Sequence, residues 1–158
     1  DKRMIEINAA PKAVFDHIDA MPNKFPVYKV FETAVFFYIR MALVDGYASA
    51  QKAVREKTAP RAVTYLKTGE KMGPFTLIEK QRPERYFFKL DSLFFKCRTG
   101  YRITGTSAGT HLVFDTIAEN PTQQEKLWWY CVRPVHILFG NKVLRNIKAQ
   151  VETGRFNA

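Results

Sequence analysis

The sequence predicts an α+β fold in which an antiparallel sheet wraps around a long C-terminal helix. Apolar residues recur with a helical period in the N-terminal segments, with the period of strands from Arg61 onward, and with a helical period again after Thr122. Short turns separate the strand segments, which favours antiparallel pairing over parallel strands with their long crossovers. With 158 residues and 46% hydrophobic side chains, the chain is expected to form a single domain over residues 1–158.

The N-terminal part of the chain predicts one strand and two helical segments. Residues 4–8 alternate between apolar and polar side chains, as a short strand does. Pro11 suits the first turn of the helix that follows, because that position does not need the N–H group that proline lacks. A second helical segment is expected over residues 28–44, and the Asp45-Gly46 pair ends it.

Residues 27–44 are apolar and long enough to raise the question of a membrane-spanning helix. The segment contains Lys29, Glu32 and Arg40. One charge near the centre of a spanning helix costs roughly 2.5–3.5 kcal/mol on insertion scales. We therefore predict that this segment packs on the core and that the chain has no integral membrane segment.

The middle of the chain predicts five strands joined by short turns. Turn signals fall between them, among them Thr68-Gly69 and Arg82-Pro83. The short connections predict a meander in which each strand pairs with the next along the chain. The expected strands are 62–67, 75–80, 85–90, 94–103 and 110–118.

The charge pattern of the fourth of these strands predicts which of its faces is buried. Lys96, Arg98 and Arg102 share one face, and we expect that face to meet solvent. The opposite face then points toward the last helix, and the same parity applies to the next strand. Tyr101 and Phe114 are therefore expected to line the space under that helix. The inward sets are Phe95, Cys97, Thr99, Tyr101 and Ile103 on one strand and Leu112, Phe114 and Thr116 on the other.

Residues 127–152 predict a long closing helix. A Thr122-x-x-Glu125 capping box precedes it. Pro134 is expected to kink or split the helix, because proline lacks an N–H group and clashes with the preceding turn. Spacings of three and four residues place one apolar stripe along the helix, formed by Ile137, Gly140, Leu144, Ile147 and Val151.

The charge balance bears on the class of partner. The net charge is +10, which favours anionic partners. The basic residues are spread over the whole chain, however, and no run of four Lys or Arg occurs. We therefore predict a solvated basic surface and no nucleic-acid partner.

The cysteines and histidines predict neither a metal site nor a disulfide framework. Cys97 and Cys131 lack Cys-x-x-Cys spacing, and none of His17, His111 and His136 has a His or Cys four residues away. We expect two buried free thiols, no metal and no cofactor. Reduced thiols and the lack of a signal-peptide pattern predict a cytoplasmic protein.

Two cationic side chains stand alone in aromatic-rich helical segments. Arg40 would need a carboxylate or a ligand anion if it is buried, and an intramolecular salt bridge or an exposed position is the alternative. His136, just after Pro134, can face a cavity or form a hydrogen bond in the core or at the surface. We hypothesise that Arg40 and His136 reach one cavity and bind a carboxylate or enol head group there.

The order of the expected elements and several segments resemble the START-like, Bet v 1-like superfamily over nearly the whole chain. MIEINAAPKAVFDHID (4–19) is similar to the opening strand and helix of such domains, and IEKQRPERYFFKLD (78–91) and GTSAGTHLVFDTIAENP (105–121) are similar to their paired strands. WWYCVRPVHILFGNKVLRNIK (128–148) resembles a bacterial subfamily of unknown function, whose second helical segment also tends to carry an Arg, here Arg40. The strand turn departs from that subfamily, with Asp91-Ser92 in place of Asp-His.

The resemblance implies a helix-grip fold with an internal cavity between the sheet and the C-terminal helix. Binding of a hydrophobic or amphipathic small molecule in that cavity is the function that we predict first. A cyclase- or dehydratase-type enzyme acting on a polyketide-like substrate is the alternative. A protein-interaction module that forms a homodimer through an exposed patch of Trp128, Trp129 and Tyr130 is the third reading. The predicted ligand-binding residues are Arg40, Tyr65, Tyr101, Phe114, Trp128 and His136.

Overall fold

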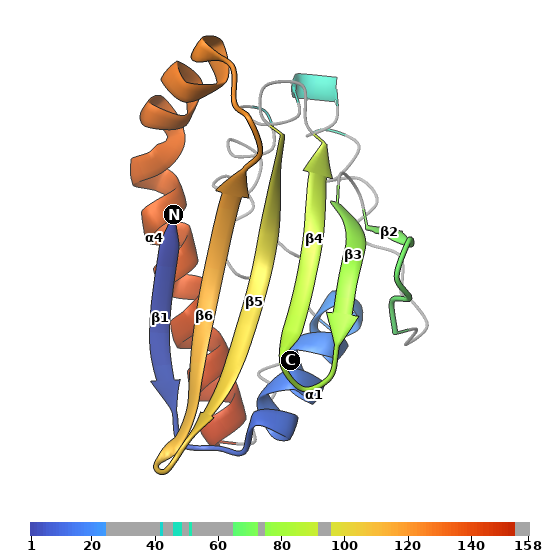
Figure 1. Cartoon of the computed structure of the whole chain (residues 1–158), viewed down its shortest axis with the longest axis vertical. Coiled ribbons are helices and arrows are strands. Elements are labelled where there is room, and N and C mark those ends of the chain that lie inside the picture. Colours follow the sequence, from blue (N-terminus) through green and yellow to red (C-terminus); the bar gives the residue numbers. More distant parts are fainter. Residues whose placement is uncertain are drawn as a thin grey trace.

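The computed structural model describes residues 1–24, 42, 46–48, 51, 65–72, 75–91 and 96–153. In this part of the chain, two long helices lie on one face of a single sheet, and the opposite face of the sheet is turned toward the viewer in Figure 1. The predicted α+β fold, with an antiparallel sheet and a long C-terminal helix, is confirmed.

Within the described ranges, the sheet has six strands in the order β1-β6-β5-β4-β3-β2, and all neighbours are antiparallel. Strands β3 to β6 form the predicted meander, and β1 pairs with β6 at the edge opposite to β2. The strands are β1 (Lys2–Ile7), β2 (Lys71–Met72), β3 (Phe75–Gln81), β4 (Arg85–Asp91), β5 (Lys96–Thr106) and β6 (Gly109–Ala118).

The strand predicted at 62–67 is wrong for residues 65–67, which carry no strand. The short strand β2 pairs with β3 instead. Just before β2, the backbone N of Gly69 donates to the carbonyl of Leu77 at 2.7 Å, and Leu77 N donates to the carbonyl of Glu70 at 2.9 Å. Gly69 has a φ of 94°, which favours glycine, so the turn at this residue decides which segment reaches the sheet edge.

Helix α1 (Pro11–Lys24) begins at the predicted proline and packs against the sheet. Val14, Phe15 and Ile18 lie on one side of the helix and are buried. The Phe15 ring meets the Tyr86 ring of β4 edge to face, with 5.9 Å between the ring centroids. These contacts fix α1 across the helix-covered face of the sheet.

Helix α4 (Gln123–Thr153) is one continuous helix, so of the two expected effects of Pro134, a kink or a split, the split does not occur. Its axis changes direction along its length in Figure 1. The predicted apolar stripe is confirmed by the burial of Gly140, Leu144 and Ile147. A Cβ atom on Gly140 would lie 3.2 Å from the Phe114 ring, so the absence of a side chain lets α4 approach β6 closely.

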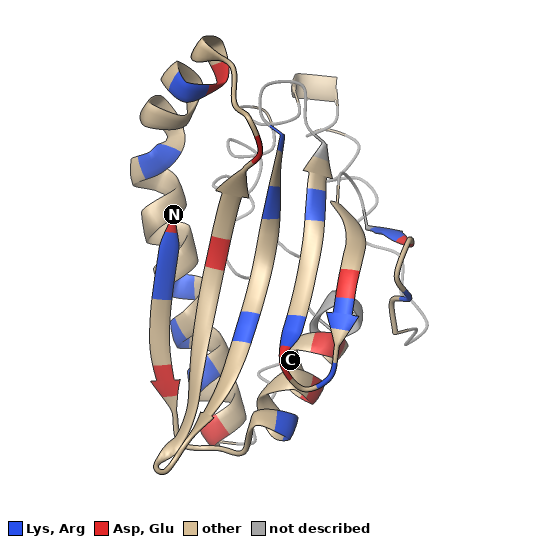
Figure 2. Cartoon of the chain, viewed as in Figure 1, with Lys and Arg blue, Asp and Glu red and all other residues tan. Residues whose placement is uncertain are grey.

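The predicted parity of β5 and β6 is confirmed. Cys97 is buried on the side that carries the helices, whereas Lys96 and Arg102 are exposed on the other side. Tyr101 lies opposite Phe114 in the register of the two strands, with 5.4 Å between their ring centroids. Figure 2 shows Lys and Arg residues distributed along β3, β4 and β5.

Ion pairs connect the strands across the face without helices. Glu79 of β3 accepts hydrogen bonds from Arg98 of β5 at 2.6 Å and from Arg85 of β4 at 3.3 Å. Asp115 of β6 pairs with Arg102 of β5 at 2.5 Å. Part of the positive charge on this face is therefore neutralised by carboxylates of the sheet itself.

One of the two cysteines departs from the prediction. Cys97 is buried, but Cys131 is exposed, so the expectation of two buried thiols is wrong for Cys131. Cys131 lies on α4 at helical spacing from Leu127 and Leu138, whose side chains are 68% and 69% exposed. Apolar neighbours in the sequence therefore did not place this thiol in the core, because the helix turns this side away from the sheet.

The helices within the described ranges do not combine the length and apolar character that crossing a bilayer requires. Most of the helix predicted over residues 28–44 lies outside the described residues.

The predicted capping box at the start of α4 is confirmed. Thr122 N donates to Glu125 Oε2 at 2.7 Å, and Glu125 N donates to Thr122 Oγ1 at 3.2 Å. The backbone N–H of Thr122, followed by its hydroxyl group, lowers the pKa of Glu125 below its usual value. A carboxylate whose pKa is lowered by folding stabilises the folded state at neutral pH, and this contribution is lost as the pH falls through the lowered pKa.

We expect Glu125→Gln to lower the melting temperature near neutral pH and to have little effect in acid, where the wild-type carboxylate is itself protonated. Thermal unfolding followed by circular dichroism across this pH range measures the difference. Glu84→Gln, at an exposed position in the β3–β4 turn, is the matched control and should show no such pH dependence. An equal loss at both ends of the pH range would contradict a role for the Glu125 charge.

Candidate functional site

Among the described residues, exposure differs between the two ends of the face of the sheet that carries α1 and α4. Toward the β5–β6 hairpin, α1 and the C-terminal half of α4 fill it, and Phe15, Leu112 and Ile147 are at most 1% exposed. Toward the other end, which is the upper end in Figure 1, the N-terminal half of α4 runs beside the sheet. We call this region the upper inner face. Its residues keep partial exposure, and they include Thr99, Tyr101, Trp128, Trp129, His136 and Phe139.

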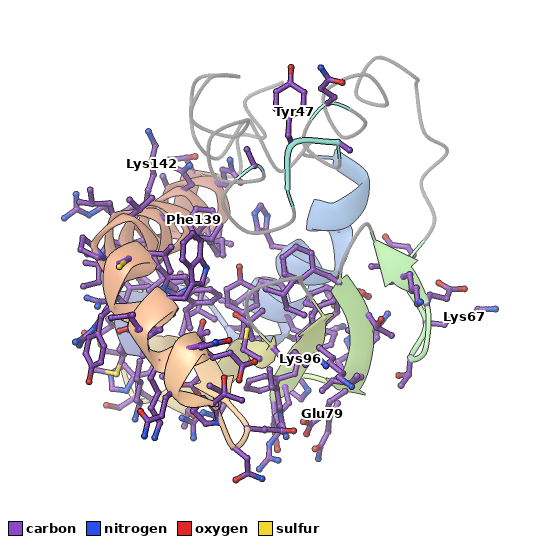
Figure 3. The ribbon with its side chains drawn as sticks, turned by 90° about the horizontal axis from the view of Figure 1, so that it is seen from above. Tyr47, Lys67, Glu79, Lys96, Phe139 and Lys142 are labelled. Carbon is purple, nitrogen blue, oxygen red and sulfur yellow. The ribbon has the colours of Figure 1, made fainter. Side chains whose placement is uncertain are left out.

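Helix α4 presents rings to the upper inner face. In Figure 3, Phe139 lies on the sheet side of α4, and Lys142 points away from the sheet. The Phe139 and Phe114 ring centroids are 6.5 Å apart. The ring of His136 stacks on Phe114 at 5.8 Å, and Trp129 meets His136 edge to face at 5.0 Å. His136 is therefore enclosed by aromatic rings from both α4 and β6.

His136 also joins this aromatic shell to a polar pair at the edge of the sheet. Its Nδ1 atom lies 3.2 Å from Oδ2 of Asp1. Arg3 donates to the other oxygen of the same carboxylate over 2.8 Å. The side chains of His136 and Asp1 are 17% and 5% exposed, so water screens this pair less than it would at the surface.

A chain of hydroxyl groups continues from His136 into the sheet. The Nε2 atom of His136 lies 3.2 Å from Oγ1 of Thr116, and this hydroxyl lies 3.0 Å from Oγ1 of Thr99. Thr99 also lies 3.2 Å from the backbone carbonyl of Asp115. Thr116 is 5% exposed, whereas Thr99 keeps partial exposure. The polar chain thus runs from Asp1 at the β1 edge to Thr99 on the upper inner face.

Two tyrosines lie side by side on the same face of the sheet. Tyr86 of β4 and Tyr101 of β5 are opposite each other in the strand register. Although Tyr101 keeps partial exposure, desolvation of its hydroxyl group raises its pKa above the usual value, and burial followed by the charge of Asp19 raises the pKa of Tyr86. Both side chains are therefore neutral phenols at physiological pH, and their hydroxyl groups can donate hydrogen bonds.

The structure brings three of the predicted ligand-binding residues together. Tyr101, Phe114 and His136 form a continuous set of rings on the upper inner face. Trp128 lies at the same end of α4 and packs, together with Trp129, against the cluster formed by Leu90 and Cys97. Four of the predicted residues therefore lie on α4, β5 and β6.

Of the other two predicted residues, Tyr65 is described, and it is not brought to this set. Tyr65 is 57% exposed, and Nζ of Lys80 in β3 lies 5.9 Å from the centroid of its ring. Because two strands separate β3 from β6, Tyr65 lies toward the opposite edge of the sheet from His136. Arg40 lies outside the described residues, so its predicted meeting with His136 stays a prediction.

The polar chain contains three residues that sequence reasoning did not select. The alternation of β5 and β6 placed Thr99 and Thr116 on the inward faces, and a hydroxyl at a buried inward position signals a hydrogen-bond partner. Asp1 carries no comparable signal, because its partner His136 is 135 positions away in the chain.

The aromatic patch predicted for a dimer partner is exposed only in part. Trp128 and Trp129 are half-buried against the sheet, and Tyr130 is 68% exposed. In the ranges that the structure describes, no three His, Cys, Asp or Glu side chains are grouped closely enough to hold a metal ion.

No protein-family model matches the chain, and no curated protein matches it. Among solved structures, the chain is similar to the crystal structure of DynU16, a protein of the dynemicin biosynthetic locus, with a TM-score of 0.51 and 15% sequence identity. The match covers 98% of this chain and 47% of DynU16, so the chain spans about half the length of that protein. At this identity the likeness concerns the fold, and it extends over nearly all of the chain.

Proposed function

We propose that the chain binds a hydrophobic or amphipathic small molecule between the upper inner face of the sheet and α4. The observation that carries this proposal is the partial exposure of Tyr101, Trp129, His136 and Phe139, which all lie on the helix-covered side of the sheet. Among the described residues, Phe15, Leu112 and Ile147 at the other end of the same side are at most 1% exposed, whereas the partly exposed rings lie beside the N-terminal half of α4.

The chemistry of the upper inner face suits a ligand with an apolar body and one polar group. Tyr101, Phe114 and Phe139 offer ring surfaces, and small-molecule sites are lined mostly by apolar and aromatic side chains. The Asp1–His136 pair and the hydroxyl of Thr99 supply a small number of placed polar groups beside those rings. Such a combination fixes the orientation of a ligand whose affinity comes mainly from apolar contact.

Native mass spectrometry of the purified protein tests the proposal directly, and we expect a retained small molecule or saturable uptake of an added one. With the anionic amphiphile 8-anilinonaphthalene-1-sulfonate as the probe, His136→Ala should weaken binding about tenfold, because it removes a ring of the upper inner face and leaves the Asp1 carboxylate without its His136 partner. His111→Ala is the matched control, because His111 lies on β6 at the opposite parity to Thr116 and Phe114.

Melting temperatures of both variants separate binding from stability. A lower melting temperature of His136→Ala with unchanged probe affinity would contradict the proposed site and leave only a structural role for His136. Absence of saturable uptake by the wild type, with any of a panel of amphiphiles, would contradict ligand binding itself.

A second candidate function is catalysis of the cyclase or dehydratase kind on a polyketide-like substrate. The observation that favours it is the Asp1–His136 pair, since a carboxylate that accepts the Nδ1 proton leaves Nε2 as the basic nitrogen of a neutral ring. Turnover of a β-keto thioester that His136→Ala abolishes and His111→Ala retains would support it. Binding of the same compound without turnover would favour the first function.

A further inference from the structure

When His136 is neutral, the side chains of the hydrogen-bond chain from Asp1 to Thr99 supply one proton fewer than the chain has contacts. Four contacts follow one another, from Asp1 to His136, to Thr116, to Thr99 and to the Asp115 carbonyl, at 3.2, 3.2, 3.0 and 3.2 Å. Each contact needs one proton between its two atoms. A neutral imidazole brings one and the two threonines bring one each, which makes three for four contacts.

The carboxylate of Asp1 fixes the direction in which these protons point. Arg3 donates to it, so the carboxylate is an acceptor, and the Nδ1 atom of His136 must carry a proton. In the neutral ring, Nε2 then accepts from Thr116, and Thr116 in turn accepts from Thr99. The contact between Thr99 and the Asp115 carbonyl is left without a proton.

Protonation of His136 reverses the whole chain. Nε2 then donates to Thr116, Thr116 donates to Thr99, and Thr99 donates to the Asp115 carbonyl, so that all contacts are satisfied. Among the described residues, the charged groups beside this chain are the Asp1 carboxylate and Arg3, which pair with each other, and the Asp1 amino group, which donates to the Thr116 carbonyl at 2.9 Å. The Asp115 side chain belongs to the opposite face of the sheet, where it pairs with Arg102. From β6 and α4, Thr116 and the rings of Phe114, Trp129 and Phe139 contact His136.

We propose that Thr99 is a specificity-determining residue of the ligand site. His136, acting through Thr116, sets whether the Thr99 hydroxyl donates a hydrogen bond to the ligand or accepts one from it. Thr99 is the member of the hydroxyl pair with partial exposure, so it is the one that can meet a ligand. While His136 is neutral, the Thr99 proton is engaged with Thr116, so Thr99 can only accept a hydrogen bond, for example from a phenol or enol. When His136 is protonated, Thr116 donates to Thr99, and the Thr99 proton points either to the Asp115 carbonyl or to a carboxylate or carbonyl oxygen of the ligand. This inference rests on the proposed ligand site.

The probes 2-naphthol and 2-naphthoate test the inference, because they share one ring system and differ in whether they donate or accept. Isothermal titration over about pH 5.5 to 8, a range centred near the usual pKa of histidine, gives the affinity of each. We expect the wild type to favour 2-naphthol in the alkaline part of the range, and its affinity for 2-naphthoate to rise as the pH falls. Thr99→Val should weaken naphthol binding at the alkaline end by about three- to tenfold, the value of one hydrogen bond.

Two further variants make the test specific. Thr104→Val changes the same residue type at an exposed position of β5 on the opposite face, and it should leave both affinities unchanged. Thr116→Val keeps Thr99 but breaks its link to His136, so the opposite pH trends of the two probes should disappear. Nitrogen-15 chemical shifts of the His136 ring give a second readout without ligand, with the proton expected on Nδ1 in the neutral wild type.

Each result decides between the two proposals. If neither naphthalene binds the wild type, the ligand site itself is contradicted for these aromatic probes. If both bind and Thr99→Val leaves their relative affinities and pH trends as in the wild type, the role of Thr99 is overturned and the site stands. A neutral His136 that carries its proton on Nε2 would overturn the proposed direction of the chain.

Discussion

Replacement of Leu144 by alanine is expected to lower the free energy of unfolding by about 2–5 kcal/mol, the range measured for buried leucines. Leu144 is 2% exposed and belongs to the core that joins α4 to α1 and the sheet. Removing most of its side chain loses apolar burial and leaves a cavity that a helix packed on a sheet closes poorly. Because the upper inner face exists only while α4 lies beside the sheet, ligand binding should weaken together with stability.

Leu138→Ala is the matched control on the same helix. Leu138 is 69% exposed, and its replacement should change the free energy of unfolding by no more than about 0.5 kcal/mol. Urea unfolding followed by circular dichroism gives both values from the midpoint and slope of the transition. Equal losses at the two positions would contradict the orientation of α4 on the sheet.

Replacement of Gly100 by alanine is expected to cost about 3 kcal/mol, at the upper end of what overpacking a close-packed site costs. A Cβ atom on Gly100 would collide with the backbone carbonyl oxygen of Tyr86 and would lie 2.6 Å from the Cα atom of Phe87. These are main-chain atoms of the neighbouring strand β4, so no rotamer change can relieve the collision. The two strands must move apart, and that weakens the pairing between β4 and β5 that holds Tyr86 beside Tyr101.

Gly105→Ala on the same strand is the control for a general effect of removing glycine. A Cβ atom at Gly105 would meet only the side-chain Cγ of Pro11, at 3.2 Å, and that ring can shift. Thermal unfolding of the two variants should therefore separate them clearly, with Gly100→Ala far less stable. Similar melting temperatures would show that β4 and β5 are less closely packed than their register implies.

The features that sequence reasoning predicted correctly are those with a local physical cause. The alternation of Lys96, Arg98 and Arg102 with uncharged side chains was enough to orient β5, because one residue of slippage would have buried every charge. The spacing of Gly140, Leu144 and Ile147 by four and three residues places them on one face of α4, and this was enough to predict which face of the helix is buried.

Sequence reasoning missed features in which two segments compete for the same strand partner. It also missed contacts between residues that are far apart in the chain. Residues 65–67 have the composition of a strand, but Gly69 and Glu70 take the backbone partners on β3. The candidate site has the same origin, since its aromatic members follow from strand parity and helix spacing, whereas the pairing of Asp1 with His136 depends on how β1 docks at the far end of the fold. No local pattern encodes a contact of that kind.

The position of β1 in the sheet also bears on the order in which the molecule can form. Its strand partner is β6, and the backbone bond between Asp1 and Thr116 joins residues 115 positions apart. Closing a loop of that length costs conformational entropy before the contacts between the two strands can offset that cost. Topologies rich in such long-range contacts therefore fold slowly. During synthesis, β1 leaves the ribosome long before β6 and α4 exist. The Asp1 side of the candidate site is therefore completed only after the C-terminal third of the chain has been made.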